Sequence, residues 1–514
     1  MERQDKNCLS TFQLTNFYFL KSHLKAFIRI LFKPFSFLLN LGVSLIGLIS
    51  LIADFFRMYP QLIIPKLIQV YLPLTFFGKP VWAFYYQVFI RFRKYHVHVL
   101  AGTGAGKSFL LLHLIYRDIK AGYGLVVIEP HSQLIKHVLH LRILGLDHKK
   151  EYYKKILLLD FEDEDPPAFN LFAIELPKDP KKREIQVNSV VQNYMEAFEK
   201  AFDIPKGTKR VLKNLLTVLF YLPNATLLDG LNMLQAKETL PLKYIELFNT
   251  LENPVLKKYF SGDFFSSRTD VSKEALRLRL EHLLLDRQIR LSLTKPNNIL
   301  NLEQVFYEGR IILVKAGEDI GEENTRFIGA LVHQFILFGG LRLISRKYKK
   351  PFSIYLDECQ NYISADISKG LDEARKAKIQ YTLSHQRTRQ RNMNREQQRA
   401  LNSCGVKIYG RMPDHDDAFR QCRQLLMRNK QDRFMNLRVG EFFCKLGWLK
   451  TRFIKVPRYF APSAEKIGET EHELFCKTKD YLALMRYLKG SIKKATAPKE
   501  AKTQLSNNFT INEF

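Results

Sequence analysis

A glycine-rich stretch, AGTGAGKS, begins at Ala101, between the short apolar run YHVHVL and the amphipathic segment SFLLLHLIY. Strand, glycine-rich turn and helix in this order are the setting of a phosphate-binding P-loop, whose backbone amides curl around phosphate groups. Ala101 replaces the usual first glycine, which the looser form of the pattern allows. A glycine-rich turn without a ligand would not need Lys and Ser at its last two positions. The stretch therefore predicts a nucleoside triphosphate site on an α/β sheet.

Each residue of this loop has an expected role. Lys107 would hold the β- and γ-phosphates, and the hydroxyl of Ser108 would bind Mg2+. The cradle around the phosphates would consist of Gly102, Thr103, Gly104, Ala105 and Gly106. ATP and Mg2+ are therefore the predicted cofactors, and ATP hydrolysis is the predicted activity.

Such a loop needs an acidic partner at the end of a neighbouring strand, and FSIYLDECQ provides Asp357 followed by Glu358. We expect Asp357 to hold the metal ion through water and Glu358 to polarise the attacking water. An acidic pair at a helix N-terminus is the alternative. Asp160, in KILLLDFEDED, also ends an apolar run, but the acidic residues after it favour an exposed loop.

The apolar run IQYTLSHQ ends at Gln386, whose amide could sense the γ-phosphate; a polar strand terminus without that role is the alternative. The basic run RTRQRNMNREQQR follows at once. Against one acid, Glu396, it holds Arg387, Arg389, Arg391, Arg395 and Arg399. Such a run suits contact with the DNA phosphate backbone without reading sequence. A solvated helix face has the same composition.

Arg375 lies in EARKAK, between the acidic pair and Gln386. P-loop motors often complete the site of one subunit with an arginine from its neighbour. We expect Arg375 to act in trans in this way, near the rim of the site. The alternative is an exposed helix arginine paired with Asp372 or Glu373.

The composition restricts the partners. A formal charge of +29 and a pI near 9.7 indicate a polyanionic partner, either nucleic acid or an anionic membrane surface. The six cysteines form no CxxC pair and have no His at ligand spacing. This pattern argues against a zinc site or a disulfide framework and fits a reducing compartment.

The N-terminal region is strongly apolar. Residues 34–53 carry no formal charge over 20 positions and are long enough for a transmembrane helix. A second span is expected at about 60–90, where Lys66 and Lys79 interrupt the apolar residues. A buried hairpin or an interfacial helix is the alternative. Lys21, Lys25, Arg29 and Lys33 precede the first span, so we expect a hairpin in the cytoplasmic (inner) membrane with the motor domain facing the cytoplasm.

Periodicity along the chain predicts five parts. Residues 96–183 alternate short apolar runs with amphipathic stretches, which is typical of a parallel sheet with crossover helices. Apolar residues then follow helical spacing until about residue 300, after which the strand pattern returns. The predicted parts are a membrane anchor (1–90), a first ATPase part (91–184), an all-α insert (185–300), a second ATPase part (301–457) and a C-terminal extension with a mobile basic tail (458–514).

The order of motifs resembles a known superfamily. The segments are AGTGAGKS, VVIEPHSQL, ILLLDFEDEDPPAFNLF, a helical insert, EGRIILVKAGEDIGEENTRFIGALVHQFI, IYLDECQNYIS, EARKAKIQYTLSHQ and SCGVKIYGRMPDHDDA. Over residues 90 to 455 this order is similar to the FtsK/HerA superfamily of hexameric DNA pumps, and within it to the TraD/TraG-like coupling proteins of type IV secretion and conjugation. One departure is that relatives often show Asp-Pro-His-Gly-Asp where this chain has Glu129-Pro130-His131-Ser132-Gln133.

The resemblance implies a RecA-like motor domain interrupted by an all-α domain, an N-terminal membrane anchor and a hexameric ring around DNA. It also implies a relaxase and secretion-channel proteins as partners. We therefore expect an ATP-driven translocase that pumps DNA, single-stranded in this interpretation, toward a type IV secretion or conjugation channel. A soluble HerA-like translocase in DNA processing is the alternative. A non-catalytic assembly subunit is disfavoured because Lys107, Ser108, Asp357 and Glu358 are all present.

Overall fold

The computed structural model describes most of the chain beyond the N-terminal region. The described residues are 89, 92–236, 241–343, 350–363, 367–387, 393–427, 430–456, 475–476 and 478–496. Apart from Phe89, the predicted membrane segments at 34–53 and about 60–90 lie outside these residues, as do Arg389, Arg391 and the tail beyond residue 496. All described residues belong to one compact unit, Tyr86–Phe514.

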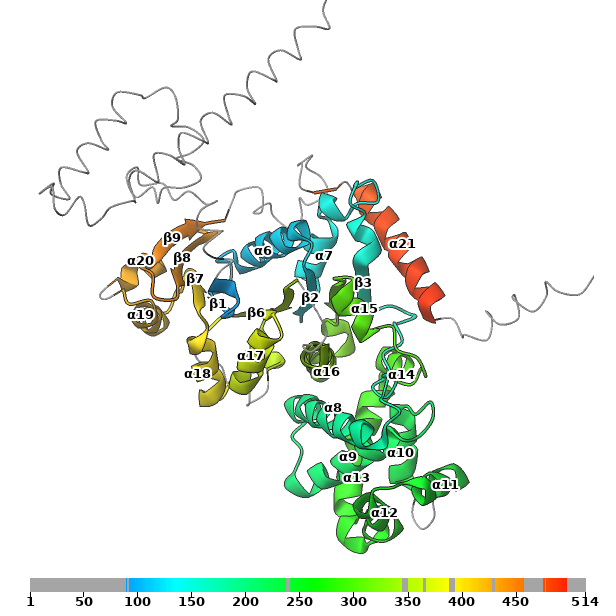
Figure 1. Cartoon of the computed structure of the whole chain (residues 1–514). Coiled ribbons are helices and arrows are strands. Elements are labelled where there is room, and N and C mark those ends of the chain that lie inside the picture. Colours follow the sequence, from blue (N-terminus) through cyan, green and yellow to red (C-terminus); the bar gives the residue numbers. More distant parts are fainter. Residues whose placement is uncertain are drawn as a thin grey trace, which may run out of the picture. The chain divides into compact units, whose positions relative to one another are not determined.

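A nine-stranded sheet with the order β3-β4-β2-β5-β6-β1-β7-β8-β9 lies at the centre of this unit (Figure 1). The strands are β1 (Val97–Leu100), β2 (Gly124–Glu129), β3 (Ile156–Asp160), β4 (Ile311–Lys315), β5 (Phe352–Leu356), β6 (Ile379–His385), β7 (Val406–Tyr409), β8 (Glu441–Leu446) and β9 (Arg452–Lys455). Strands β1 to β7 pair in parallel, whereas β8 and β9 add antiparallel. The predicted mostly parallel sheet is confirmed.

Helices cover both faces of the sheet, which explains why its central strands are buried along their whole length. Figure 1 shows α6 (Lys107–Ala121) and α7 (Gln133–Leu139) on one side, and α16 (Glu322–Leu343), α17 (Ile367–Lys376) and α18 (Arg395–Ser403) on the other. Every residue of β1, β2, β5 and β6 is buried. In such a sheet the carboxyl ends of the parallel strands share one edge, where ligands bind.

Every regular element described between β3 and β4 is helical. The α-helices there are α8 (Pro180–Ala201), α9 (Lys206–Leu219), α10 (Leu227–Gln235), α11 (Leu242–Thr250), α12 (Pro254–Ser261), α13 (Ser267–Leu285), α14 (Arg287–Leu293) and α15 (Leu302–Tyr307). Helix α8 buries Val187, Val191, Tyr194 and Phe198, an apolar stripe at helical spacing, and packs along α16. The Phe198 ring lies 4.8 Å from that of Phe327, so the helical region and the sheet share one apolar core.

Three helices lie toward the C-terminus: α19 (His415–Gln424), α20 (Gln431–Met435) and α21 (Thr478–Thr496). Helix α21 packs beside β3, where the Tyr481 ring stacks on His140 at 4.0 Å and Lys489 forms an ion pair with Asp163. The helix thus lies at the β3 edge of the sheet.

Helix α16 is, among the described residues, the one helix long and apolar enough to cross a membrane. Its most apolar 18-residue window is 83% buried inside the protein, which makes it the central core helix of this unit. The predicted spans at 34–53 and 60–90 remain predictions.

Candidate active site

The loop between β1 and α6 has the backbone that a phosphate cradle requires. Gly104 and Gly106 adopt φ angles of 70° and 90°, in the left-handed region that side chains disfavour. A Cβ atom on Gly106 would lie 2.7 Å from the backbone nitrogen of Gly440, so only glycine fits there. Thr103 and Gly104 are exposed at the tip of the loop, and the 15-residue helix α6 begins directly after it. Exposed loop amides at a helix N-terminus suit an anion.

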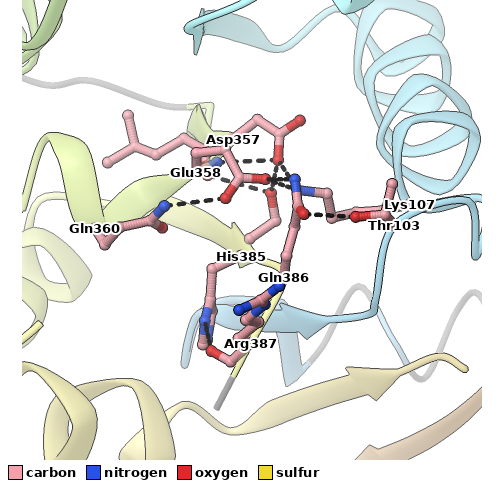
Figure 2. A network of polar contacts seen from close by, with 10 residues as sticks. Thr103, Lys107, Asp357, Glu358, Gln360, His385, Gln386 and Arg387 are labelled. Atoms are coloured by element: carbon pink, nitrogen blue, oxygen red, sulfur yellow. Dashed lines mark hydrogen bonds and ion pairs between the residues drawn. The ribbon is translucent and has the colours of Figure 1, made fainter. Parts of the chain in front are cut away.

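Lys107 reaches across to the predicted acidic pair at the end of β5. Its Nζ lies 2.7 Å from Asp357 Oδ1 and also contacts Glu358 Oε1 (Figure 2). The three side chains are only 9%, 7% and 6% exposed. The structure therefore brings together the lysine and both carboxylates that the sequence indicated.

Asp357 is held by several donors at one oxygen. Besides Lys107, Ser384 Oγ donates to Oδ1 at 2.6 Å and the backbone N–H of Glu358 donates at 3.0 Å. All of these contacts use Oδ1, so Oδ2 can accept a further ligand. Glu358 itself has a φ of 49°, an uncommon conformation for a residue with a side chain that often marks functional sites.

Gln386 joins the P-loop to Glu358. Its Nε2 donates to Glu358 Oε1 at 2.8 Å, while its Oε1 accepts from Thr103 Oγ1 at 2.8 Å (Figure 2). The other oxygen of Glu358 accepts from Gln360 Nε2 at 3.0 Å. The side chain at the end of β6 thus contacts both the loop tip and the predicted water-activating carboxylate.

Charge at this cluster is set by burial and ion pairing together. Burial alone would lower the pKa of Lys107, but the nearby Asp357 and Glu358 carboxylates outweigh it and raise the pKa. Burial alone would raise the pKa of Glu358, but Lys107 outweighs it and lowers the pKa. The lysine and Glu358 therefore stay ionised at neutral pH, so Glu358 can accept a proton.

Glu129, at the end of β2, is a further carboxyl beside this cluster. Burial, followed by the charge of Asp357, raises its pKa to about 8. Its Oε1 accepts from the backbone N–H of Ile135 at 3.2 Å, which ties it to α7. The first residue of the altered Glu129–Gln133 loop is thus an acid that is mostly protonated at neutral pH.

The residues present fit a Mg2+-bound nucleoside triphosphate. The loop amides and Lys107 suit phosphate oxygens, whereas the Ser108 hydroxyl and Asp357 are oxygen ligands of the kind Mg2+ prefers. Among the described residues there is no group of three or more His, Cys, Asp or Glu side chains that could hold a metal ion.

Asp160, the other strand-end carboxylate, lies away from the loop. Strands β4 and β2 separate β3 from β5, and Asp160 pairs with Lys315 at 3.1 Å. This position agrees with the preference for Asp357, but the expected exposed loop is wrong for Asp160 itself, which is buried as the last residue of β3.

Arg375 is not near the P-loop of its own chain. It lies in the last turn of α17, with its guanidinium 5.6 Å from the centre of the Tyr95 ring. Tyr95 precedes β1, whereas the P-loop follows it, so Arg375 lies at the opposite edge of the sheet from the site. The expected position near the rim is wrong for the same subunit, because α17 leads into the amino end of β6. Action in trans remains a prediction.

The basic run starts beside the site. Arg387 directly follows Gln386 and is exposed, and Arg395 and Arg399 are exposed one turn apart on α18. Gln397, Ala400 and Leu401 form the buried face of that helix. The described arginines therefore point away from the core.

Three features of the site were not predicted. Gln360 follows Glu358 by two residues, the raised pKa of Glu129 depends on Asp357 in another strand, and His98 on β1 contacts His385 on β6. The alternation of polar and apolar residues in YHVHVL places His98 on one face of the strand. Its contact with His385 depends on the order of the strands, which the alternation does not show.

The chain was compared with protein families, curated proteins and solved structures. No protein-family model and no curated protein matches the chain. Among solved structures, the unbound bacterial conjugative coupling protein TrwB is 14% identical and matches with a TM-score of 0.51 over 71% of this chain and 85% of its own. TrwB bound to ADP and Mg2+ matches with the same identity and TM-score over 71% and 86%. TrwB with the GTP analogue GDPNP does so over 72% and 86%.

These matches concern the fold. They cover 71–72% of this chain and 85–86% of each TrwB chain. The chain therefore has the fold of the conjugative coupling protein TrwB, which agrees with the fold that the sequence resemblance implied.

Proposed function

We propose that this protein is an ATP-hydrolysing motor that moves DNA toward a conjugation or type IV secretion channel. The observation that carries the proposal is the continuous contact path from Thr103 through Gln386 to Glu358 and Lys107. This path joins the P-loop, the acidic pair and the start of the basic run.

ATP would bind with its phosphates in the 102–106 cradle and at Lys107. Ser108 and Asp357 would hold Mg2+, which supplies charge neutralisation at the phosphates. Phosphate oxygens at the loop would compete with Asp357 and Glu358 for the Lys107 ammonium. The TrwB complexes with ADP and Mg2+ and with GDPNP support this choice of ligand.

Glu358 would orient a water molecule and accept its proton, because its lowered pKa keeps the side chain ionised and its carboxylate lies next to Gln386. Gln386 would report the state of the site, since it contacts both Thr103 and Glu358. Any movement of its amide is passed directly to Arg387, the next residue of the chain. This adjacency is the proposed link between hydrolysis and DNA movement.

DNA contact is supported by the exposed arginines at 387, 395 and 399 and by the net charge of +29. Single-stranded DNA is the proposed substrate, with a hexameric ring as the active form, and a relaxase and channel proteins as partners. Residues 1–90 would anchor the ring to the membrane.

The test uses the full chain, extracted with detergent and purified. The parent protein should hydrolyse ATP faster when single-stranded DNA is added, and should displace streptavidin from the biotinylated end of an oligonucleotide only with ATP. Lys107→Ala should lose both activities, whereas Lys120→Ala, at an exposed position of the same helix, should keep them. ATP hydrolysis without streptavidin displacement would reject DNA movement while leaving the ATPase in place.

A further inference from the structure

The segment after β7 is bonded to the first half of the P-loop. The backbone N–H of Gly410 donates to the Leu100 carbonyl at 2.9 Å, and the N–H of Gly102 donates to the Arg411 carbonyl at 2.9 Å. A Cβ on Gly102 would lie 3.1 Å from that same carbonyl. The position of the Arg411 backbone is therefore set by the loop itself.

The Arg411 side chain extends to the exposed tip of the loop. Its Nη2 lies 3.8 Å from the point that a Cβ on Gly104 would occupy. The side chain is partly exposed, and no ion pair joins it to any carboxylate within the described ranges. A guanidinium beside an anion cradle, without a carboxylate to neutralise it, is suited to a phosphate oxygen.

Strand order places Arg411 opposite the hydrolytic groups. Strand β6, which Gln386 directly follows, flanks β1 on one side, and β7 flanks it on the other. Thr103 is contacted from the β6 side, where Glu358 and Lys107 also meet. The γ-phosphate belongs on the side of the water-activating carboxylate, so the β7 side faces the phosphates nearer the nucleoside.

We infer that Arg411 is a nucleotide-binding residue that acts within its own subunit and donates hydrogen bonds to the α- and β-phosphates. The inference rests on the proposed ATP site and adds a second cation to it, across the loop from Lys107. Because ATP and ADP share these phosphates, Arg411 strengthens the binding of both equally and contributes little to the chemical step.

The test is a fluorescence titration of the purified full chain with mant-ADP and with a non-hydrolysable mant-ATP analogue. Arg411→Gln keeps the backbone carbonyl that holds Gly102, so the loop stays in place. It should raise the Kd for both ligands by the same factor, about tenfold to 100-fold, as expected for a charge-assisted hydrogen bond. Arg411→Lys should have Kd values between those of the parent and Arg411→Gln. If Arg411→Gln does not fold, the comparison of Arg411→Lys with the parent replaces it. The KM for ATP should rise while kcat at saturation changes by less than about threefold.

Competition with inorganic pyrophosphate identifies the group that Arg411 contacts. The inhibition constant of pyrophosphate against mant-ADP should be higher for Arg411→Gln than for the parent. It should rise by the same factor as the Kd for mant-ADP. Arg423→Gln, which removes an exposed arginine from α19, is the matched control and should bind like the parent.

Two results would overturn the inference. The first is that the parent and Arg411→Gln bind mant-ADP with equal affinity. The second is that Arg411→Gln loses affinity for mant-ADP but not for pyrophosphate. If the parent itself binds neither ligand, the proposed ATP site fails, and the inference fails with it.

Discussion

His98 on β1 and His385 on β6 contact each other inside the sheet, with their Nε2 atoms 2.8 Å apart and their ring planes 4° from parallel. His385 Nδ1 lies 2.8 Å from the Arg387 carbonyl, which can only accept, so Nδ1 carries the proton. In neutral His385, Nε2 then carries no proton and can only accept. The pair thus ties the strand before the P-loop to the residue that opens the basic run.

This histidine pair predicts a loss of stability in mild acid. Burial lowers the pKa of His385 from 6.5 to about 4, so between these values the unfolded chain binds a proton that the folded chain does not. The contribution of neutral His385 to the free energy of unfolding is complete above about pH 6.5 and is lost as the pH falls toward 4. Between pH 7 and 5 this amounts to about 2 kcal/mol for one such histidine.

Urea unfolding of the full chain in detergent at pH 7 and pH 5 tests this expectation. His385→Gln should show a smaller difference between the two pH values than the parent. His415→Gln, at an exposed position, should match the parent. An unchanged difference in His385→Gln would mean that this histidine is not held neutral.

Glu358→Gln should bind ATP but fail to turn it over. The substitution removes the proton acceptor while Asp357 and Ser108 remain, so hydrolysis should fall by about 10²- to 10⁴-fold. Steady-state phosphate release together with mant-ATP binding measures both quantities. Asp160→Asn, at the carboxylate that ends β3, is the control and should hydrolyse ATP normally. Hydrolysis by Glu358→Gln at the parent rate would show that the acidic pair was assigned wrongly.

Gln386→Ala should uncouple DNA from hydrolysis. It removes the contacts with both Thr103 and Glu358 but leaves every arginine of the basic run. We expect unchanged DNA affinity with little or no stimulation of ATP hydrolysis by DNA. The measurement is the ratio of DNA-stimulated to basal rates, with Gln398→Ala on α18 as the control. A parental ratio would leave Gln386 as a polar strand terminus.

Neutralising Arg387, Arg389 and Arg391 together should weaken the salt dependence of DNA binding. Each phosphate contact with single-stranded DNA contributes about 0.7 to the slope of log K against log salt, so the slope should fall by about 2. Fluorescence anisotropy at several salt concentrations measures it. A control that replaces Lys181, Lys182 and Lys206, all exposed in the helical region, should keep the parental slope. If the triple arginine variant also keeps it, the run is a solvated surface, and lipid becomes the expected partner for the net charge.

Arg375 should act on the ATP of a neighbouring subunit. Its position on α17, across the sheet from its own P-loop, leaves it available to another chain. Arg375→Ala and Lys107→Ala should each be inactive alone. Mixed rings would contain some interfaces with an intact P-loop facing an intact arginine, so mixing the two proteins should restore part of the ATPase activity. A mixture that co-assembles and stays inactive would contradict action in trans.

The parts of the site that follow from local backbone chemistry could be predicted from the sequence. The glycines of the P-loop, the helix after it, the carboxylates at the end of an apolar strand and Gln386 at the end of another are each recognisable within about ten residues. Alternation of apolar runs with amphipathic stretches was enough to predict the mostly parallel sheet, because strands covered by helices on both faces are mostly apolar.

Only the tertiary structure decided which of these segments meet. The order β5-β6-β1-β7 places Gln386 on one side of the P-loop and Arg411 on the other, and brings His98 to His385. It also sets the charge states, since Glu129 is protonated at neutral pH because burial and Asp357 act on it together. Pairing between distant strands and burial depend on how the whole chain packs, and neither can be seen in a window of neighbouring residues.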